Sequence, residues 1–335
     1  MFTFAMRRLA IAIPTLLFIS LIVFLLLNLA PNDPMAQVPL TVPPEVKQKM
    51  REALGLGQPL HVQYFKWLVQ FFWIEPQVLI DHLFNTQFSK DDLRVISWQT
   101  RSPVMDVVVQ RLPQTLWVVG MAYLVGILIA LPIGIYSAYR QYSVFDQVGT
   151  FVAMIGYSVP PFFSGVAVIV LFAVQLGWLP STYNTLHEVV NWDSFIIQLK
   201  QMVLPVMVLA LQTTAQLSRF MRASVLDNLN QDYVRTARAK GLNEWTVVMV
   251  HVLRNSMIPV VTVIALNVPS IFGGAIITEQ VFKVNGVGQQ LILAIYANDL
   301  PTVQTLVFIF TILIIFFNLL ADLIYGVLDP RIRYD

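Results

Sequence analysis

Cysteine is absent from this chain of 335 residues, which excludes disulfide bonds, thiolate metal ligands and cysteine nucleophiles. Histidine is scarce as well, and the four histidines lie far apart, at positions 61, 82, 187 and 251. Their separations match no common metal-binding motif. The sequence therefore predicts no metal site.

Charged residues are few, at 12% of the chain compared with about 25% in a typical soluble domain. Hydrophobic residues make up 57% of the chain. The formal net charge of +2 is too small to suggest a nucleic acid as partner. These proportions are typical of an all-α polytopic membrane protein, whose main solvent is lipid.

The phosphate-binding motif Gly-x-x-x-x-Gly-Lys-Ser/Thr is also missing from the sequence. If the chain takes part in ATP-driven transport, another polypeptide must therefore hydrolyse the ATP. No apolar run carries the paired carboxylates or the serine–histidine spacing that a membrane-embedded hydrolase needs. The sequence predicts no catalytic residue and no cofactor in this chain.

Long apolar runs dominate what is present. A membrane-spanning helix needs about 20 apolar residues, and the candidates are residues 9–29, 115–138, 150–176, 202–217, 259–277 and 303–325. The first is interpreted as an uncleaved transmembrane helix, not a signal peptide, because it is too long for a signal core. The predicted division is a transmembrane helix in residues 1–30, an external segment 31–111, a core 112–328 with five transmembrane helices, and a tail 329–335.

Basic residues predict the orientation of these spans. Lysine and arginine are concentrated in short loops that face the cytoplasm, and the loop over residues 226–258 contains four of them. Residues 31–111 contain eight, but long segments cross the membrane largely regardless of charge. An even number of spans places both termini on the same side as this loop. We therefore expect both termini and this loop to be cytoplasmic, and residues 31–111 to be external.

The loop contains a basic segment, YVRTARAKGL, at residues 233–242. Good helix formers precede Gly241, and a glycine commonly ends a helix in this way. The segment therefore predicts a short amphipathic helix at the membrane surface. The pattern alone favours an ordinary basic connecting loop over a surface that a partner protein grips.

Polar residues at the end of the fourth apolar run form a stripe. Gln212, Gln216 and Arg219 share one face of a helix because they lie four and then three residues apart. They could line a translocation path, or they could hold helices together by hydrogen bonds. Ser158 and Asn267 are further candidates for the path.

Acidic residues near the ends of the apolar runs leave alternatives open. Glu279 closes the fifth run, where it could be functional or could face the lipid headgroups. Asp227 and Asp232 are expected to pair with Arg222 or Arg235 at the surface.

The basic segment resembles the cytoplasmic loop signature of permease subunits of ATP-binding-cassette importers, which reads Glu-Ala-Ala, three residues, then Gly. With Gly241 on the signature glycine, Arg235, Thr236 and Ala237 take the Glu-Ala-Ala positions. Arg235 thus replaces the signature glutamate. The run is similar to the version found in the peptide and nickel importer branch.

Further motifs resemble the B-type permease subunit of dipeptide and oligopeptide importers. They extend over nearly the whole chain: the first apolar run with its following Asp-Pro, RLPQTL at 111–116, SVPPFF at 158–163, MRAS at 221–224, RNSMIPVVT at 254–262 and LDPRIR at 328–333. Two positions depart from the family, which usually has Gly-Asp-Pro at 32–34 and Trp-Pro-Gly at 284–286.

The resemblance implies a type I importer fold with six transmembrane helices and a coupling helix that docks on an ATPase subunit. It implies that the coupling residues are Arg235, Thr236, Ala237, Arg238, Ala239, Lys240, Gly241 and Leu242. The implied partners are a second, C-type permease subunit, two ATPase subunits that carry ATP and Mg, and an external solute-binding protein. The implied location is the bacterial inner membrane, and the implied role is half of a path for peptides or peptide-like solutes.

A lone secondary transporter is the alternative function. It would need an ion or proton site near the middle of the membrane, and the apolar runs contain almost no central carboxylate. The sequence does not identify the substrate.

Overall fold

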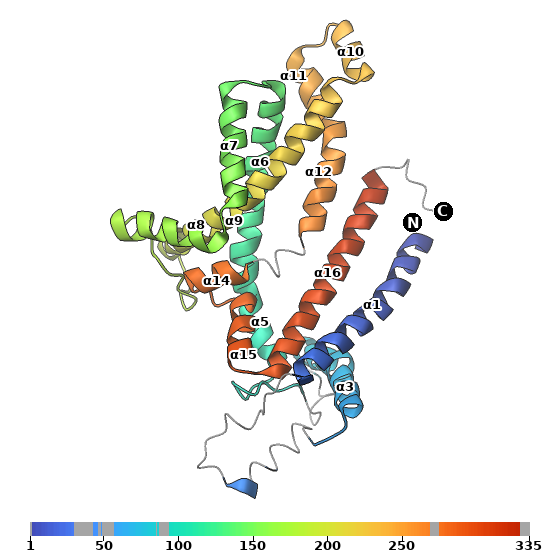
Figure 1. The fold of residues 1–335 in the computed structure, drawn as a ribbon, viewed down its shortest axis with the longest axis vertical. Helices are drawn as coiled ribbons and strands as arrows, with labels where there is room; N and C mark the ends of the chain where they lie inside the picture. Colours follow the sequence, from blue (N-terminus) through green and yellow to red (C-terminus); the bar gives the residue numbers. More distant parts are fainter. Residues whose placement is uncertain are drawn as a thin grey trace. The chain divides into compact units, whose positions relative to one another are not determined.

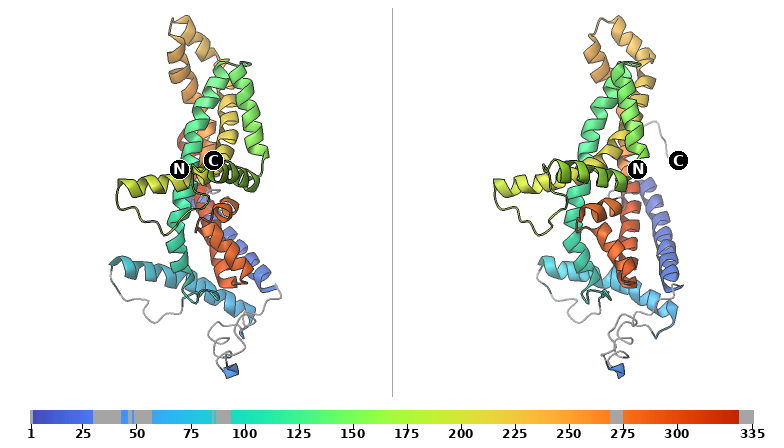
Figure 2. Two further views of the ribbon diagram at one scale, coloured as in Figure 1. Left: turned by 90° about the vertical axis from the view of Figure 1, so that its left-hand side faces the viewer. Right: turned by 60° about the vertical axis from the view of Figure 1, so that its left-hand side comes forward.

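The computed structural model describes residues 2–29, 43–45, 48, 57–84, 86, 94–268 and 275–328. The tail predicted at 329–335, most of residues 31–56 and residues 269–274 of the fifth predicted span lie outside these ranges. Within them the elements are helical, apart from an isolated bridge between Ile96 and Pro103. Figures 1 and 2 show the helices.

In the described ranges, five helices are long and apolar enough to cross a membrane. They are α1 (Phe2–Leu29), the continuous helix of α5 (Val104–Thr115), η3 (Leu116–Gly120) and α6 (Met121–Tyr139), α9 (Trp192–Leu229), the continuous helix of α11 (Glu244–Thr246), η5 (Val247–Val252) and α12 (Leu253–Asn267), and α16 (Leu300–Leu328).

The third predicted span, residues 150–176, is a bent pair of helices, which counts as a sixth span if the pair is taken as one. It consists of α7 (Val144–Ser158) and α8 (Pro161–Val168) with η4 (Ile169–Gln175), and the two parts are bent by 106°. Val159 and Pro160 adopt extended backbone conformations between them. A proline lacks the amide proton of a helical bond and disfavours helix in the residue before it, so the Pro160–Pro161 pair breaks the span.

The helices also begin and end beyond the predicted apolar runs. Asn191 and Ser194 form a capping box that starts α9 well before residue 202. The helix that ends in α12 starts at Glu244 instead of residue 259. Both extensions contain polar residues, which a search for apolar runs leaves out. The predicted loop 226–258 therefore contains the end of one long helix and the beginning of another.

The chain divides into two compact units. Unit 1 comprises residues 1–10, 113–289 and 313–335, and unit 2 comprises residues 11–112 and 290–312. In unit 1, α6 and α9 pack closely because small residues lie between them. A Cβ atom at Gly126 would lie 2.7 Å from the Cβ of Thr213, and one at Gly134 would lie 2.6 Å from the Cβ of Met221.

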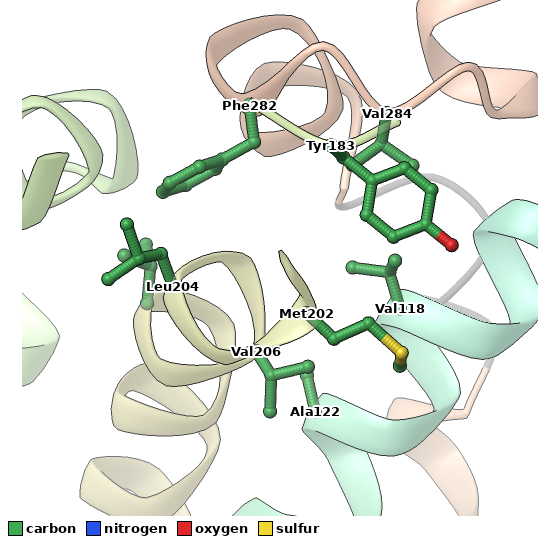
Figure 3. Close-up of a cluster of buried hydrophobic side chains, with 9 residues drawn as sticks. Val118, Ala122, Tyr183, Met202, Leu204, Val206, Phe282 and Val284 are labelled. Carbon is green, nitrogen blue, oxygen red and sulfur yellow. The ribbon is translucent and has the colours of Figure 1, made fainter. Parts of the chain in front are cut away.

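A buried apolar cluster joins one end of α9 to its neighbours in unit 1 (Figure 3). It consists of Val118, Ala122, Tyr183, Met202, Leu204, Val206, Val208, Phe282 and Val284. The Tyr183 hydroxyl donates to Gln114 Oε1 at 2.8 Å and accepts from Gln198 Nε2 at 2.5 Å. Burial raises the pKa of Tyr183, so this hydroxyl stays protonated and keeps both hydrogen bonds.

Glu279 lies in α14 (Ile276–Phe282) of unit 1 and is 1% exposed, which excludes the predicted headgroup contact. It accepts hydrogen bonds from the Thr115 hydroxyl at 2.7 Å and from the Gln289 amide at 2.8 Å. A Cβ at Gly286 would lie 2.5 Å from Glu279 Oε2. The glycine therefore makes room for a buried carboxylate that holds the chain before α15 (Val287–Tyr296) in place.

Unit 2 contains α3 (Leu60–Val69), η2 (Gln70–Ile74) and α4 (Glu75–Phe84), together with parts of α1, α5 and α16. The rings of Trp67 and Phe71 pack on Phe308 of α16, at centroid distances of 5.0 and 4.9 Å. Arg94 forms ion pairs of 2.8 Å with both Glu75 and Asp106. These contacts order part of the predicted external segment.

Candidate functional site

The basic segment contains the short helix that the sequence predicts. This helix, α10, covers Asp232–Ala239, and Lys240 caps it. Gly241 has a φ of +77°, and its amide donates to the carbonyl of Arg238 at 2.9 Å. Residues other than glycine rarely adopt this left-handed conformation. Gly241 therefore ends the helix and turns the chain, as predicted.

The inner face of α10 packs on its own chain. Val234 and Ala237 are 0% and 4% exposed. They belong to a buried cluster that also contains Ala138, Met221, Val225, Val247, Val252 and Val260. This cluster joins α10 to the ends of α6, α9 and α12. Ala237 thus faces inward, which corrects its predicted place on the surface that meets an ATPase subunit.

The outer face of α10 and the turn after it are exposed and basic. The exposed members of the predicted coupling set are Arg235, Thr236, Arg238, Ala239, Lys240, Gly241 and Leu242. Arg238 pairs with Glu244 at 2.6 Å, and this hydrogen bond raises the pKa of Arg238. Arg235 pairs with Asp232 at 3.4 Å, as the sequence predicts, in an exposed and therefore weak ion pair.

An exposed tryptophan that no sequence motif singles out lies beside this surface. Trp245 is 73% exposed at the start of α11. The only signal in the sequence is an aromatic residue three positions after Leu242, which an aromatic belt at the membrane surface would explain equally well.

Hydrogen bonds hold α10 to the long helices on both sides. Before it, the Tyr233 hydroxyl donates to Asn228 Oδ1 in α9 at 2.6 Å. After it, Arg238 Nη2 in α10 donates to Glu244 Oε1 in α11 at 2.6 Å, at the start of the helix that continues into α12. In Figures 1 and 2, α10 and α11 lie at the same end of unit 1 as the α6–α7 turn. A displacement of α10 would therefore reach two long helices at once.

Arg222 in α9 pairs with Asp146 near the start of α7, not with the predicted Asp227 or Asp232. Its Nε and Nη2 atoms donate to the two carboxylate oxygens at 2.6 and 2.8 Å. Asp146 is 3% exposed. The ion pair thus fixes α7 to α9 near the α10 end of unit 1, across 76 residues of sequence.

The polar stripe lies on one face of α9. Gln212 and Gln216 are half-buried and Arg219 is exposed. Arg219 Nε donates to the carbonyl of Ala215 at 3.2 Å, and its guanidinium lies over the ring of Tyr157, 4.8 Å from the centroid. This contact places the guanidinium of Arg219 next to Tyr157 at the end of α7.

The two other path candidates also end helices. Ser158 follows Tyr157, is exposed, and is the last residue of α7. Asn267 is half-buried and is the last residue of α12. Among the residues that the structure describes, no group of three or more histidine, aspartate or glutamate side chains could hold a metal ion.

Comparison with known proteins identifies the family of this chain. Residues 130–334 match the family described as "Binding-protein-dependent transport system inner membrane component". Residues 1–119 match the N-terminal family of the same transport system membrane components. The first match alone covers more than half of the chain.

Curated relatives are similar to this chain over all or nearly all of its length. The chain is 34% identical to the oligopeptide transport system permease protein AppB of Bacillus subtilis (strain 168) over 342 residues, covering 100% of both chains. It is 34% identical to a putative peptide transport system permease protein of Brucella abortus (strain 2308), covering 98% of each. It is 35% identical to the glutathione transport system permease protein GsiC of Salmonella choleraesuis (strain SC-B67), covering 100% of each.

These matches favour a permease component of a transport system over a lone secondary transporter. They also agree with the helical, multi-pass architecture of a type I importer membrane domain. The chain therefore belongs to the family of binding-protein-dependent transport system inner membrane components.

Proposed function

We propose that this permease subunit forms half of a translocation path for peptides or small peptide-like solutes, and that α10 couples the path to a partner ATPase. The observation that carries the proposal is the two-sided nature of α10. Its inner face, with Val234 and Ala237, is buried between the long helices, and its outer face is basic and exposed. Such a helix transmits a push from a partner protein to the spans.

The path itself would run along the polar stripe of α9. A neighbouring residue of α9, not a stripe residue, makes a hydrogen bond to α6: the Thr214 hydroxyl donates to the carbonyl of Gly126 at 3.2 Å. The stripe residues Gln212, Gln216 and Arg219 lie on the other face of α9 from Thr214. Polar groups at this depth favour water or a polar partner over lipid, which supports a path with Ser158 and Asn267 as further members.

The proposed assembly contains a second, C-type permease subunit, two ATPase subunits that bind ATP and Mg, and an external solute-binding protein. The peptide class of substrate comes from the names of the relatives, which include oligopeptide, peptide and glutathione permeases. Both termini and α10 are proposed to be cytoplasmic, and residues 31–111 external. ATP binding would close the ATPases, move α10 and shift the spans between two states.

The substitution Gly241→Val tests the coupling role. It forces a β-branched residue into a left-handed conformation, at a cost of about 1–2 kcal/mol or more, although no atom lies within 4 Å of the new Cβ. Gly177→Val is the matched control, because Gly177 has a φ of +64° and equally open surroundings. We expect Gly241→Val to abolish uptake and ATPase co-purification in the full assembly, and Gly177→Val to retain both. Normal uptake with bound ATPases in Gly241→Val would refute the coupling role.

A further inference from the structure

We infer that Arg219, stacked on Tyr157, binds a carboxylate group of the transported solute. The inference rests on the proposed function, because it assigns a ligand chemistry to one part of the proposed path. It also selects a class of substrate: small solutes with a free carboxylate.

The guanidinium of Arg219 forms no ion pair within the described part of the chain. Asp146 at the other end of α7 is already taken, since Arg222 donates to both of its oxygens at 2.6 and 2.8 Å. Arg219 uses Nε for the carbonyl of Ala215, at 3.2 Å. The two terminal nitrogens therefore keep donors for a ligand.

The position of Arg219 favours a solute over a lipid headgroup. Its guanidinium extends back toward Ala215, which lies roughly 20 Å along α9 from its end at Leu229. Tyr157 fixes this level, because a Cβ at the neighbouring Gly156 would lie 3.4 Å from the Cβ of Ala215. The side chain of Arg219 thus extends away from the α10 end of α9 and toward its middle. The helix α9 is apolar enough to span a membrane.

The chemistry of the group fits a carboxylate. A guanidinium is a planar fork that binds the two oxygens of a carboxylate in parallel. The face of an aromatic ring holds the guanidinium plane in place by a cation–π interaction. Tyr157 supplies such a ring at 4.8 Å, so the fork is oriented before a ligand arrives.

The rest of the stripe fits the backbone of a short peptide. Gln216 and Gln212 lie about 5 and about 10 Å from Arg219 along the helix axis. An extended peptide advances about 3.3 Å per residue, so three residues cover the same length. Each glutamine amide both donates and accepts hydrogen bonds. A tripeptide with its carboxylate on Arg219 can therefore place its peptide groups against both glutamines.

The test compares uptake of trialanine with uptake of trialanine amide, in proteoliposomes that contain the full assembly. The measured quantity is the ratio of the two rates, in the parent and in Arg219→Gln. Any preference of the solute-binding protein is the same for both variants and cancels from the comparison. We expect Arg219→Gln to lower the ratio about tenfold, the scale of one charged hydrogen bond, and Arg219→Lys to lower it less.

Arg140→Gln is the matched control, because Arg140 also lies over a tyrosine ring, that of Tyr139 at 5.7 Å, but at the end of α6 outside the stripe. It should leave the ratio unchanged. A ratio that Arg219→Gln leaves unchanged would overturn the inference and leave the proposed function intact. A parent assembly that imports neither peptide would overturn both.

A second measurement removes the solute-binding protein altogether. Photocrosslinking of a benzophenone-labelled tripeptide to the purified complex should be stronger for the free carboxylate than for the amide. Arg219→Gln should abolish that difference while Arg140→Gln preserves it. Equal crosslinking of the two peptides to the parent would also overturn the inference.

Discussion

Ser224 of α9 donates its hydroxyl to the backbone carbonyl of Ser256 in α12 at 2.8 Å. The Ser256 hydroxyl has a single proton, which it shares between the carbonyl of Val252 in its own helix, at 2.9 Å, and the carbonyl of Ser224, at 3.2 Å. Ser224 is 9% exposed and Ser256 is 0% exposed. This serine pair joins the two long helices close to the points where they lead into and out of α10. It makes α9, α10 and α12 one mechanical block, which is what a helix that transmits motion to the membrane spans requires.

The serine pair predicts a non-additive loss of stability. Ser224→Ala and Ser256→Ala should each cost about 0.6 kcal/mol, a typical value for hydrogen bonds between membrane helices, and the double variant less than the sum. Thermal unfolding of the purified assembly in detergent measures the effect. Ser164→Ala is the control, because the half-buried Ser164 donates to the carbonyl of Pro160, the residue that caps its own helix. Additive losses would show that the two serines act independently.

The ion pair between Arg222 and Asp146 predicts an asymmetric result. Arg222→Gln leaves a carboxylate buried without its counter-ion, and breaking such a pair costs about 3–5 kcal/mol. Asp146→Asn combined with Arg222→Gln removes both charges and should restore most of the yield of folded protein. The measurement is the amount of monodisperse assembly after purification. If the double variant gives as little monodisperse assembly as Arg222→Gln, the positive charge of Arg222 is needed for a reason other than pairing with Asp146.

The close approach of α6 and α9 predicts that Gly134 tolerates no side chain. In Gly134→Ala, the new methyl group would lie 2.6 Å from the carbonyl oxygen of Ser218. Forcing atoms into a packed contact costs about 1–3 kcal/mol. Gly120→Ala is the matched control, since no atom lies within 4 Å of a Cβ there. Thermal unfolding should distinguish the two, and equal melting temperatures would contradict the helix contact.

The inward direction of Ala237 predicts different failures for two alanines of α10. Ala237→Trp should lower thermal stability, because the side chain is buried among Val234 and its neighbours. Ala239→Trp should leave stability unchanged and weaken ATPase binding, because Ala239 is exposed. Co-purification and thermal unfolding measure the two effects separately. If Ala237→Trp loses ATPase binding but keeps normal stability, the result would support the direct contact of Ala237 with an ATPase subunit that the sequence predicts.

The absence of cysteine allows a clean test of orientation. Single cysteines introduced by Lys240→Cys and Arg101→Cys both lie at exposed positions outside the membrane-spanning helices. A membrane-impermeant thiol reagent applied from outside intact spheroplasts should label the Arg101 position alone. Labelling at the Lys240 position would invert the proposed topology.

The sequence by itself determined those features that depend on neighbouring residues. The apolar runs indicate the membrane class because burial in lipid requires about 20 consecutive apolar residues. The helix of α10 and its end at Gly241 follow from local helix propensity and from the backbone freedom of glycine. The exposed pair of Arg235 and Asp232 also lies within one helical turn, where the side chains meet without tertiary contacts.

Only the tertiary structure decided which distant groups meet. Pro160 and Pro161 mark a break, but the bend of 106° depends on the packing of both helices. Arg222 finds Asp146 across 76 residues, which no local spacing encodes. Ala237 faces inward because α6, α9 and α12 cover that side of α10. Burial and partner choice are properties of the assembled helices, since each depends on atoms that chain order does not bring together.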